Sequence, residues 1–212
     1  GDANRILCGW HIARYADSCS FRIKLPRPAA GPGRGGTRFN LCGGQLSAPT
    51  QRALDAGLFE AYEPPAISGV HAALDLDPLH RVTPIDFGDV CVNYWIDRFG
   101  DGLAAPSNLS DLADPAYADM LVVQNPETSS PGLAFLLATI AEFGDGWEDY
   151  WSALRRNGVV VTSGWEDAYY GEFVSGGGDR PIVVSYASSP PAEVIYADPP
   201  VDTPPTGVIT DP

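Results

Sequence analysis

Residues 120–186 alternate between short apolar runs and longer helical patterns, and this alternation constrains the fold more than any other feature. Met120–Gln124 (MLVVQ) and Ile182–Tyr186 (IVVSY) are short and rich in β-branched residues, which predicts strands buried on both faces. Trp147–Arg156 (WEDYWSALRR) carries acids early and arginines late, which predicts a helix that ends at Asn157-Gly158. The full order of strand, helix, helix, strand, helix, strand predicts an α/β domain with a parallel sheet.

The other elements are predicted from caps, turn residues and periodicity. Ser130 is the predicted N-cap of an apolar helix over Leu133–Phe143, with Pro131 at its first helical position. Before residue 120 we expect a helix over Ala53–Phe59 with a turn at Gly57, and a strand or strand pair over Val82–Tyr94 interrupted at Gly88. A short helix over Leu109–Tyr117 is expected to be capped by Ser110 or Asp111 and ended by Pro115. After residue 120 we expect a strand over Val159–Thr162, a helix over Trp165–Val174, a polar turn over Ala187–Pro191 and a strand over Val194–Tyr196.

Charge divides the chain near residue 50. Residues 1–50 hold seven basic and two acidic side chains, a charge of +5, whereas residues 51–212 hold six basic and 25 acidic ones, a charge of −19. The first part also contains three of the four cysteines, at spacings that match no common zinc pattern, and many prolines and glycines. We expect it to be a poorly ordered arm or the product of out-of-frame translation, and assign it no function.

The net charge of −14 argues against nucleic acid as a partner. An apolar run of about 18 residues, the length needed for a membrane-spanning helix, is absent from the sequence.

Three loops are predicted at the carboxyl ends of the parallel strands, where α/β sheets bind their ligands. They are Thr128–Ser130, Ser163–Trp165 and Tyr186–Ser189, and they carry hydroxyls and aromatic rings instead of paired acids and histidines. Thr128–Ser130 would lie at the positive end of a helix dipole, which suits a phosphate or carboxylate, although simple helix capping explains the same residues. No G-x-S-x-G pattern surrounds Ser185–Ser189, so a serine nucleophile is not expected.

Four aromatic residues, Trp165, Tyr169, Tyr170 and Tyr186, belong to these loops or to the helix that follows one of them. They could stack on a flat or cationic ligand, or they could pack in the core, since Trp165 and Tyr169 are one helical turn apart. Tyr169 and Tyr170 could alternatively bind ferric ion as phenolates.

Glu166 and Asp167 leave one catalytic alternative open. The two acids could form the acid–base pair of a hydrolase, or they could be ordinary acids of a first helical turn.

Four stretches, in their order and spacing, make the chain resemble the thiamine-binding proteins of bacterial and archaeal ABC importers. They are Pro84–Tyr94 (PIDFGDVCVNY), Gln124–Glu142 (beginning QNPETSSPG), Gly164–Tyr170 (GWEDAYY) and Val184–Pro190 (VSYASSP). Arg52–Phe59 (RALDAGLF) matches the helix that precedes them in the family, so the resemblance covers residues 52 to about 210.

This resemblance implies an α/β, periplasmic-binding-protein-like (type II) fold of two lobes, one largely complete and the other partial. The implied division is residues 1–50 as the anomalous segment, 51–90 as partial first lobe and hinge strand, 91–190 as second lobe, and 191–212 as a truncated return toward the first lobe.

The same resemblance implies the function. The protein would be an extracytoplasmic receptor, periplasmic or at the cell surface, that closes over thiamine, thiamine phosphate or thiamine diphosphate and delivers it to an ABC permease in the membrane. We expect a monomer that is not an enzyme, with no cofactor, no metal and no catalytic residue, and a chain that does not include its signal peptide.

The resemblance also implies the site. Ser129 and Ser130 would face the hydroxyethyl or phosphate end of the ligand, and Trp165 and Tyr186 would line the pocket around its rings. The complete implied set of ligand-binding residues is Thr128, Ser129, Ser130, Trp165, Tyr169, Tyr186 and Ser188.

The chain departs from the family pattern at two places. Pro191-Ala192 occupies the place of a second pocket tyrosine, and a later pocket tryptophan would lie beyond Pro212. Gly1-Asp2-Ala3 resembles a segment that carries a ligand-contacting acid.

Overall fold

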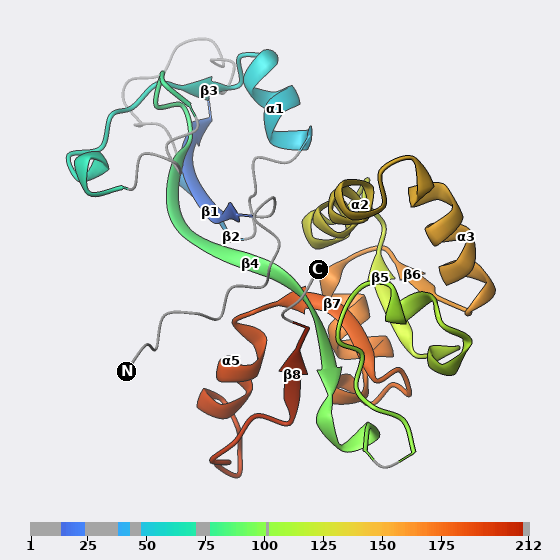
Figure 1. The fold of residues 1–212 in the computed structure, drawn as a ribbon. Helices are drawn as coiled ribbons and strands as arrows, with labels where there is room; N and C mark the ends of the chain where they lie inside the picture. Colours follow the sequence, from blue (N-terminus) through green and yellow to red (C-terminus); the bar gives the residue numbers. More distant parts are fainter. Residues whose placement is uncertain (1–13, 24–37, 43–47, 71–76, 101, 210–212) are drawn as a thin grey trace. The chain divides into compact units, whose positions relative to one another are not determined.

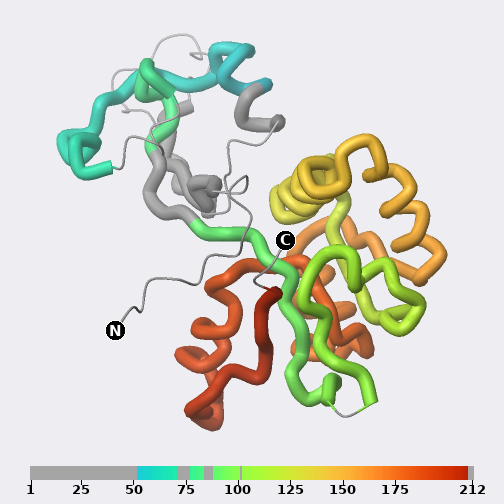
Figure 2. The backbone as a smooth tube through the Cα atoms, in the orientation of Figure 1, coloured from blue at the N-terminus to red at the C-terminus, as the bar shows by residue number. Residues whose placement is uncertain are grey.

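A computed structural model describes residues 14–23, 38–42, 48–70, 77–100 and 102–209 (Figures 1 and 2). The chain divides into two compact units, Tyr15–Gly88 and Asp89–Pro212, the latter together with Gly1–Arg14. Most of the anomalous segment 1–50, including the predicted Gly1-Asp2-Ala3 contact, lies outside the described residues.

The unit Tyr15–Gly88 contains a small antiparallel arrangement of strands. Its central strand is β1 (Arg14–Ile23), which pairs antiparallel with two other strands. Ser18–Arg22 of β1 pairs with Arg38–Cys42, and Arg22–Ile23 of β1 pairs with Phe59–Glu60. The described elements are β1 (Arg14–Ile23), β2 (Arg38–Cys42), α1 (Ala48–Asp55), β3 (Phe59–Glu60), the 3-10 helix η1 (Ile67–Gly69) and the first residues of β4 (Thr83–Trp95).

The predicted helix over Ala53–Phe59 begins and ends too late, because α1 covers Ala48–Asp55, but the predicted turn at Gly57 is confirmed. The N–H of Leu58 donates to the carbonyl of Ala53, and Gly57 reverses the chain with a φ of 64°. This closure is a common helix ending that favours glycine. Phe59 consequently lies in a strand. The predicted break of β4 at Gly88 is also absent, since the strand is continuous through it.

The unit Asp89–Pro212 is built on a mixed sheet in the order β4-β7-β5-β6, with β8 on the other side of β4. The predicted parallel layer is confirmed for β7 (Ile182–Tyr186), β5 (Leu121–Gln124) and β6 (Val160–Thr162). β4 runs antiparallel to β7, and β8 (Thr206–Val208) pairs antiparallel with β4 on its other edge.

Helices cover this sheet on both sides. α2 (Ser130–Phe143) and η6, a π-helix over Ala168–Glu172, both pack on β5 and β7, and α2 is followed by α3 (Trp147–Arg156), as Figure 1 shows. The described residues of this unit also form two short α-helices and five 3-10 helices: α4 (Trp165–Asp167), α5 (Ser189–Ile195), η2 (Ile96–Arg98), η3 (Asp111–Ala113), η4 (Pro115–Tyr117), η5 (Gly144–Gly146) and η7 (Val174–Gly176).

Three local predictions in this unit are corrected. The N-cap of α2 is Ser129, so Ser130 is already helical and Pro131 follows the first helical position. The predicted helix Leu109–Tyr117 is two 3-10 turns, because the Asp114 carboxylate accepts from the N–H of Ala116 and starts the second turn at Pro115. The predicted turn over Ala187–Pro191 is confirmed only at residues 187–188, because α5 begins at Ser189 and also replaces most of the predicted strand Val194–Tyr196; the C-terminal strand is β8.

The core of the unit lies on both faces of β5 and β7. On one face Val122 and Val183 pack with three residues of the η6 region, Ala168, Tyr169 and Phe173. The alternate residues of these strands are equally buried, as expected for strands covered on both sides. Burial of each large apolar side chain contributes about 1.5–3 kcal/mol. No helix among the described residues is long and apolar enough to cross a membrane.

Candidate functional site

The carboxyl ends of β5, β6 and β7 meet at one edge of the sheet, because these strands are parallel neighbours. The three loops predicted at this edge follow these strands in the structure. The hydroxyl of Thr128 donates to the carbonyl of Ser163 across 2.6 Å and joins the first two loops. The indole N–H of Trp165 donates to the hydroxyl of Ser185 across 2.9 Å and joins the second loop to β7.

Ser129 and Ser130 lie at the N-terminus of α2. Ser129 adopts an extended backbone conformation, and its carbonyl accepts the N–H of Leu133, but its side chain makes no capping hydrogen bond. The hydroxyl of Ser129 is therefore not used by its own helix. Together with the positive end of the α2 dipole, this arrangement suits a negatively charged or strongly hydrogen-bonding group.

Trp165 is the centre of an aromatic cluster. Its ring stacks on that of Tyr169 at 4.9 Å with 21° between the planes, and Tyr170 meets its edge at 5.4 Å. Tyr186, the last residue of β7, approaches from the side at 5.9 Å. The structure thus brings together all four aromatic residues that the sequence pattern singled out.

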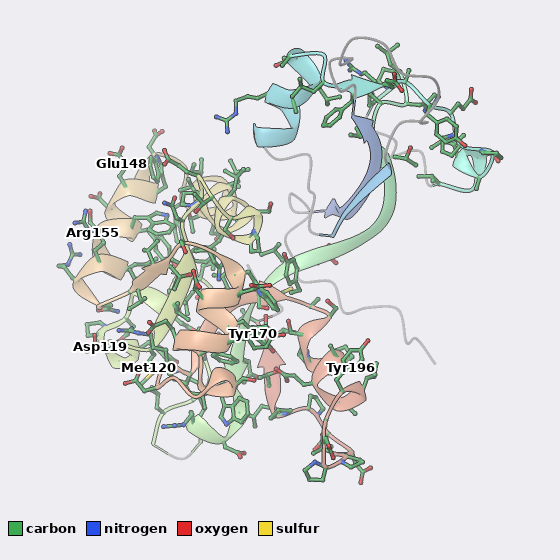
Figure 3. All side chains as sticks on the ribbon, turned by 180° about the vertical axis from the view of Figure 1, so that it is seen from behind. Asp119, Met120, Glu148, Arg155, Tyr170 and Tyr196 are labelled. Atoms are coloured by element: carbon green, nitrogen blue, oxygen red, sulfur yellow. The ribbon has the colours of Figure 1, made fainter. Side chains whose placement is uncertain are left out.

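Tyr169 and Tyr170 differ sharply in exposure, although they are neighbours in the chain. Tyr169 is 4% exposed and belongs to the core cluster, whereas Tyr170 is 62% exposed. Tyr170 is labelled in Figure 3. Both tyrosines lie in η6, where the N–H of Phe173 bonds the carbonyl of Ala168, five residues earlier. Such wide turns occur often at functional sites. Tyr169 therefore presents its ring mainly to Trp165, and Tyr170 presents its ring to solvent.

The hydroxyl of Tyr169 donates to the carboxylate of Glu193 in α5. Burial raises the pKa of the Tyr169 phenol well above its usual value, and the neighbouring Glu193 carboxylate adds to the effect. A phenol is protonated at neutral pH in any case, and the raised pKa makes the phenolate that a ferric site needs still harder to form.

Four polar residues lie behind the aromatic cluster: Ser185, Ser189, Glu193 and Thr206. The string Ser185–Ser189 was singled out in the sequence, but Glu193 and Thr206 were missed. The hydroxyls of Ser185 and Ser189 lie 2.9 Å apart, and Thr206 donates to the second oxygen of Glu193. One available signal was the repeated string Ser-Ser-Pro, which begins α2 at residues 129–131 and α5 at residues 188–190.

Ser188, the remaining predicted site residue, is the exposed N-cap of α5 and makes no side-chain capping hydrogen bond.

The acids of α4 do not form a pair. Glu166 and Asp167 are adjacent in the first turn, so their side chains diverge, and Asp167 accepts the hydroxyl of Ser163. This arrangement matches ordinary first-turn acids. Within the described part of the chain, no group of three or more His, Cys, Asp or Glu residues could hold a metal ion.

A sheet with helices on both faces, with aromatic and hydroxyl groups at the carboxyl edge of its parallel strands, defines an α/β ligand-binding domain. Residues 48–194 match the family model of the bacterial extracellular solute-binding proteins, and the chain belongs to this family.

Curated relatives confirm the resemblance found in the sequence. The thiamine-binding periplasmic protein of Brucella abortus is 35% identical over 107 residues, which cover 50% of this chain and 30% of that protein. The thiamine-binding periplasmic protein of Salmonella typhimurium is 37% identical over 112 residues, which cover 53% of this chain and 32% of that protein. The chain thus matches about a third of the length of these relatives.

A solved structure of a periplasmic binding protein shares the fold. It matches 74% of this chain and 48% of its own chain with a TM-score of 0.54 and 17% sequence identity. The predicted fold class, a partial periplasmic-binding-protein fold, is confirmed.

Proposed function

We propose that the chain is the ligand-binding component of an extracytoplasmic receptor for thiamine or its phosphates. The observation that carries this proposal is the position of Trp165, with its aromatic neighbours, at the same sheet edge as the unused hydroxyl of Ser129. Support for the ligand comes from the Brucella and Salmonella relatives, which are named for thiamine binding.

The aromatic cluster suits the rings of thiamine, which are flat and include a positively charged thiazolium. Stacking on Trp165, with Tyr186 and Tyr170 beside it, would place the cation against the ring faces. Such a contact contributes about 0.5–2 kcal/mol, depending on how far it is desolvated. Tyr169 would contribute from behind Trp165, because it is buried and stacked on that ring.

The N-terminus of α2 suits the other end of the ligand. Ser129 and Ser130 would donate hydrogen bonds to the hydroxyethyl group or to phosphate oxygens, and the helix dipole would favour the negative charge of a phosphate. Thr128 would hold this loop in place through Ser163. Ser188, at the start of α5, would add a hydroxyl at the same edge.

The wider role follows from the family. A receptor of this kind would lie in the periplasm or at the cell surface as a monomer and would pass its ligand to an ABC permease, without covalent chemistry. Residues 51–90 would belong to a first lobe with the hinge strand, 91–190 to the second lobe, and 191–212 to the return toward the first. No observation favours the hydrolase or ferric-ion alternatives over this function.

Calorimetric titration with thiamine and thiamine phosphate tests the proposal. Wild-type protein should bind at least one of them, and Trp165→Ala should bind it at least tenfold more weakly, a loss of about 1.4 kcal/mol. Trp151→Phe is the matched control, because Trp151 lies in α3 with its indole N–H on Thr139. Tryptophan fluorescence gives a second readout. If millimolar ligand produced neither heat of binding nor a change in this fluorescence, the proposal would be contradicted.

A further inference from the structure

Glu193 uses both oxygens of its carboxylate inside the protein. Oε1 accepts the hydroxyl of Tyr169, and Oε2 accepts the hydroxyl of Thr206 in β8. Glu193 is half-buried, and Thr206 is buried. A carboxylate bonded in this way links three elements, η6, α5 and β8, that are distant in the sequence.

Trp165 is linked to α5 indirectly, through Ser185 of β7 and Tyr169 of η6. Its indole N–H bonds Ser185, whose hydroxyl meets that of Ser189, and its ring face rests on Tyr169, whose hydroxyl ends on Glu193. Ser189 and Glu193 are four residues apart on α5, so they lie on the same face of that helix.

The two connections restrict different motions of the indole. The bond to Ser185 fixes the direction of the ring edge, and the stack on Tyr169 fixes the plane of the ring. The Tyr169 hydroxyl also interacts with the Ser189 side chain, so two residues of α5, Ser189 and Glu193, hold it. Tyr169 can serve as a rigid support only while its buried hydroxyl keeps these partners, because a buried phenol without a hydrogen-bond partner is costly.

We propose that Glu193 is a positioning residue that fixes the plane of Trp165 for ligand stacking by anchoring Tyr169 to α5 and β8. This inference rests on the proposed function, because it assigns Trp165 to the ligand. It adds the prediction that Glu193 affects ligand affinity, although both of its carboxylate oxygens accept hydrogen bonds from side chains of the protein.

The test compares Glu193→Ala and Glu193→Gln with a control, Glu166→Gln. Glutamine keeps an acceptor for Tyr169 and offers an N–H to the oxygen of Thr206, whereas alanine removes both contacts. Glu166 is an exposed acid next to Trp165 in the chain, so its amide variant reports the loss of one negative charge nearby.

The first readout needs no ligand. The indole N–H resonance of Trp165, assigned with Trp165→Phe, should shift and exchange faster with solvent in Glu193→Ala. It should remain near its wild-type position in Glu193→Gln and in Glu166→Gln. An unchanged resonance in Glu193→Ala would overturn the proposal even if the wild-type protein binds thiamine.

The second readout is the affinity for thiamine by calorimetry. Glu193→Ala should weaken binding about tenfold, or 1.4 kcal/mol, while Glu193→Gln should recover most of the affinity. Glu193→Gln could lose as much affinity as Glu193→Ala while the Trp165 indole resonance of Glu193→Gln stays at its wild-type position. In that case the Glu193 carboxylate acts through its charge, and the proposal that it positions Trp165 is wrong. Failure of the wild type to bind thiamine contradicts the proposed function, and the first readout still decides whether Glu193 positions Trp165.

Thr206→Val provides a second variant in case Glu193→Ala does not fold. It removes one of the two bonds to Glu193 and leaves the bond from Tyr169. It should produce a smaller shift of the same resonance and a smaller loss of affinity. A Thr206→Val protein identical to wild type in both measurements would contradict the role of the β8 contact.

Discussion

Gly132 of α2 lies directly against the carbonyl of Gln124 at the end of β5. A Cβ atom built on Gly132 would lie 2.3 Å from the oxygen of Gln124 and 2.8 Å from its carbonyl carbon. These atoms are backbone, so they cannot give way as a flexible side chain does. The absence of a side chain at Gly132 therefore allows the first turn of α2, with Ser129 and Ser130, to approach the edge of the sheet.

Gly132→Ala should destabilise the protein by about 1–3 kcal/mol, because the new methyl group must push α2 away from β5. Urea denaturation at neutral pH measures the change. The control is Gly171→Ala, at an exposed position inside η6 where a Cβ would meet nothing within 4 Å. That control should leave the stability unchanged or slightly raised. Equal stability of Gly132→Ala and wild type would show that this close approach is not required.

Thr128 and Ser129 are neighbours with separable roles. Thr128→Val removes the hydrogen bond to the carbonyl of Ser163, so it should lower the free energy of unfolding by about 0.5–1.5 kcal/mol. Ser129→Ala removes a hydroxyl that makes no capping bond, so its stability should stay within about 0.5 kcal/mol of wild type.

The Thr128→Val and Ser129→Ala variants should also differ in their affinity for the ligand. Ser129→Ala should bind thiamine phosphate several-fold more weakly, because the proposed site loses a donor for an anion at the α2 N-terminus. Calorimetry at fixed salt measures the difference. A stable Ser129→Ala protein with wild-type affinity for thiamine and for its phosphate would remove Ser129 from the site.

The elements best predicted from the sequence are those with strong local signals. β5 is an isolated β-branched run, and α3 has acids at its start, arginines at its end and Gly158 at a φ of 71° just beyond. α5 was missed because Val194-Ile195-Tyr196 is a β-branched and aromatic string typical of strands. The Ser-Ser-Pro string before it is a local helix-start signal of the kind that also precedes α2.

The aromatic part of the site was predictable, but its supports were not. Trp165 and Tyr169 are one helical turn apart, so their contact follows from local geometry. Glu193 lies 24 residues after Tyr169 and 13 before Thr206, and the sheet order alone brings these residues together. The difference in exposure between Tyr169 and Tyr170 likewise depends on packing against the strands.

Asp77 should contribute stability that is lost in acid. Its buried carboxylate accepts three hydrogen bonds from the Arg81 guanidinium and one from the Arg81 backbone N–H, which together hold its pKa below the usual 3.8. A lowered folded-state pKa stabilises the protein above pH 3.8 and loses this contribution as the pH falls through the folded-state value.

Asp77→Asn should therefore melt at a lower temperature than wild type at pH 7, and the difference should shrink as the pH approaches 3. Thermal denaturation across this range gives the comparison, with Asp97→Asn, an exposed position in η2, as control. A constant difference between Asp77→Asn and wild type at all pH values would mean that the effect is steric and not electrostatic.

Tyr150 should make the protein sensitive to alkali. Its hydroxyl donates to the carbonyl of Leu109 across 2.8 Å, and burial raises the pKa of this phenol far above its usual value of 10.0. The folded state then keeps a proton that the unfolded chain releases above pH 10, so stability is present below that pH and falls as the pH rises further. One such group changes the free energy of unfolding by about 1.4 kcal/mol per pH unit.

Tyr150→Phe should be less stable than wild type at pH 8, because the Leu109 carbonyl loses its donor, yet it should lose stability less steeply between pH 10 and 11. Urea denaturation at these pH values measures both effects, with exposed Tyr196→Phe as control. Parallel curves for Tyr150→Phe and wild type would show that Tyr150 ionises normally in the folded protein.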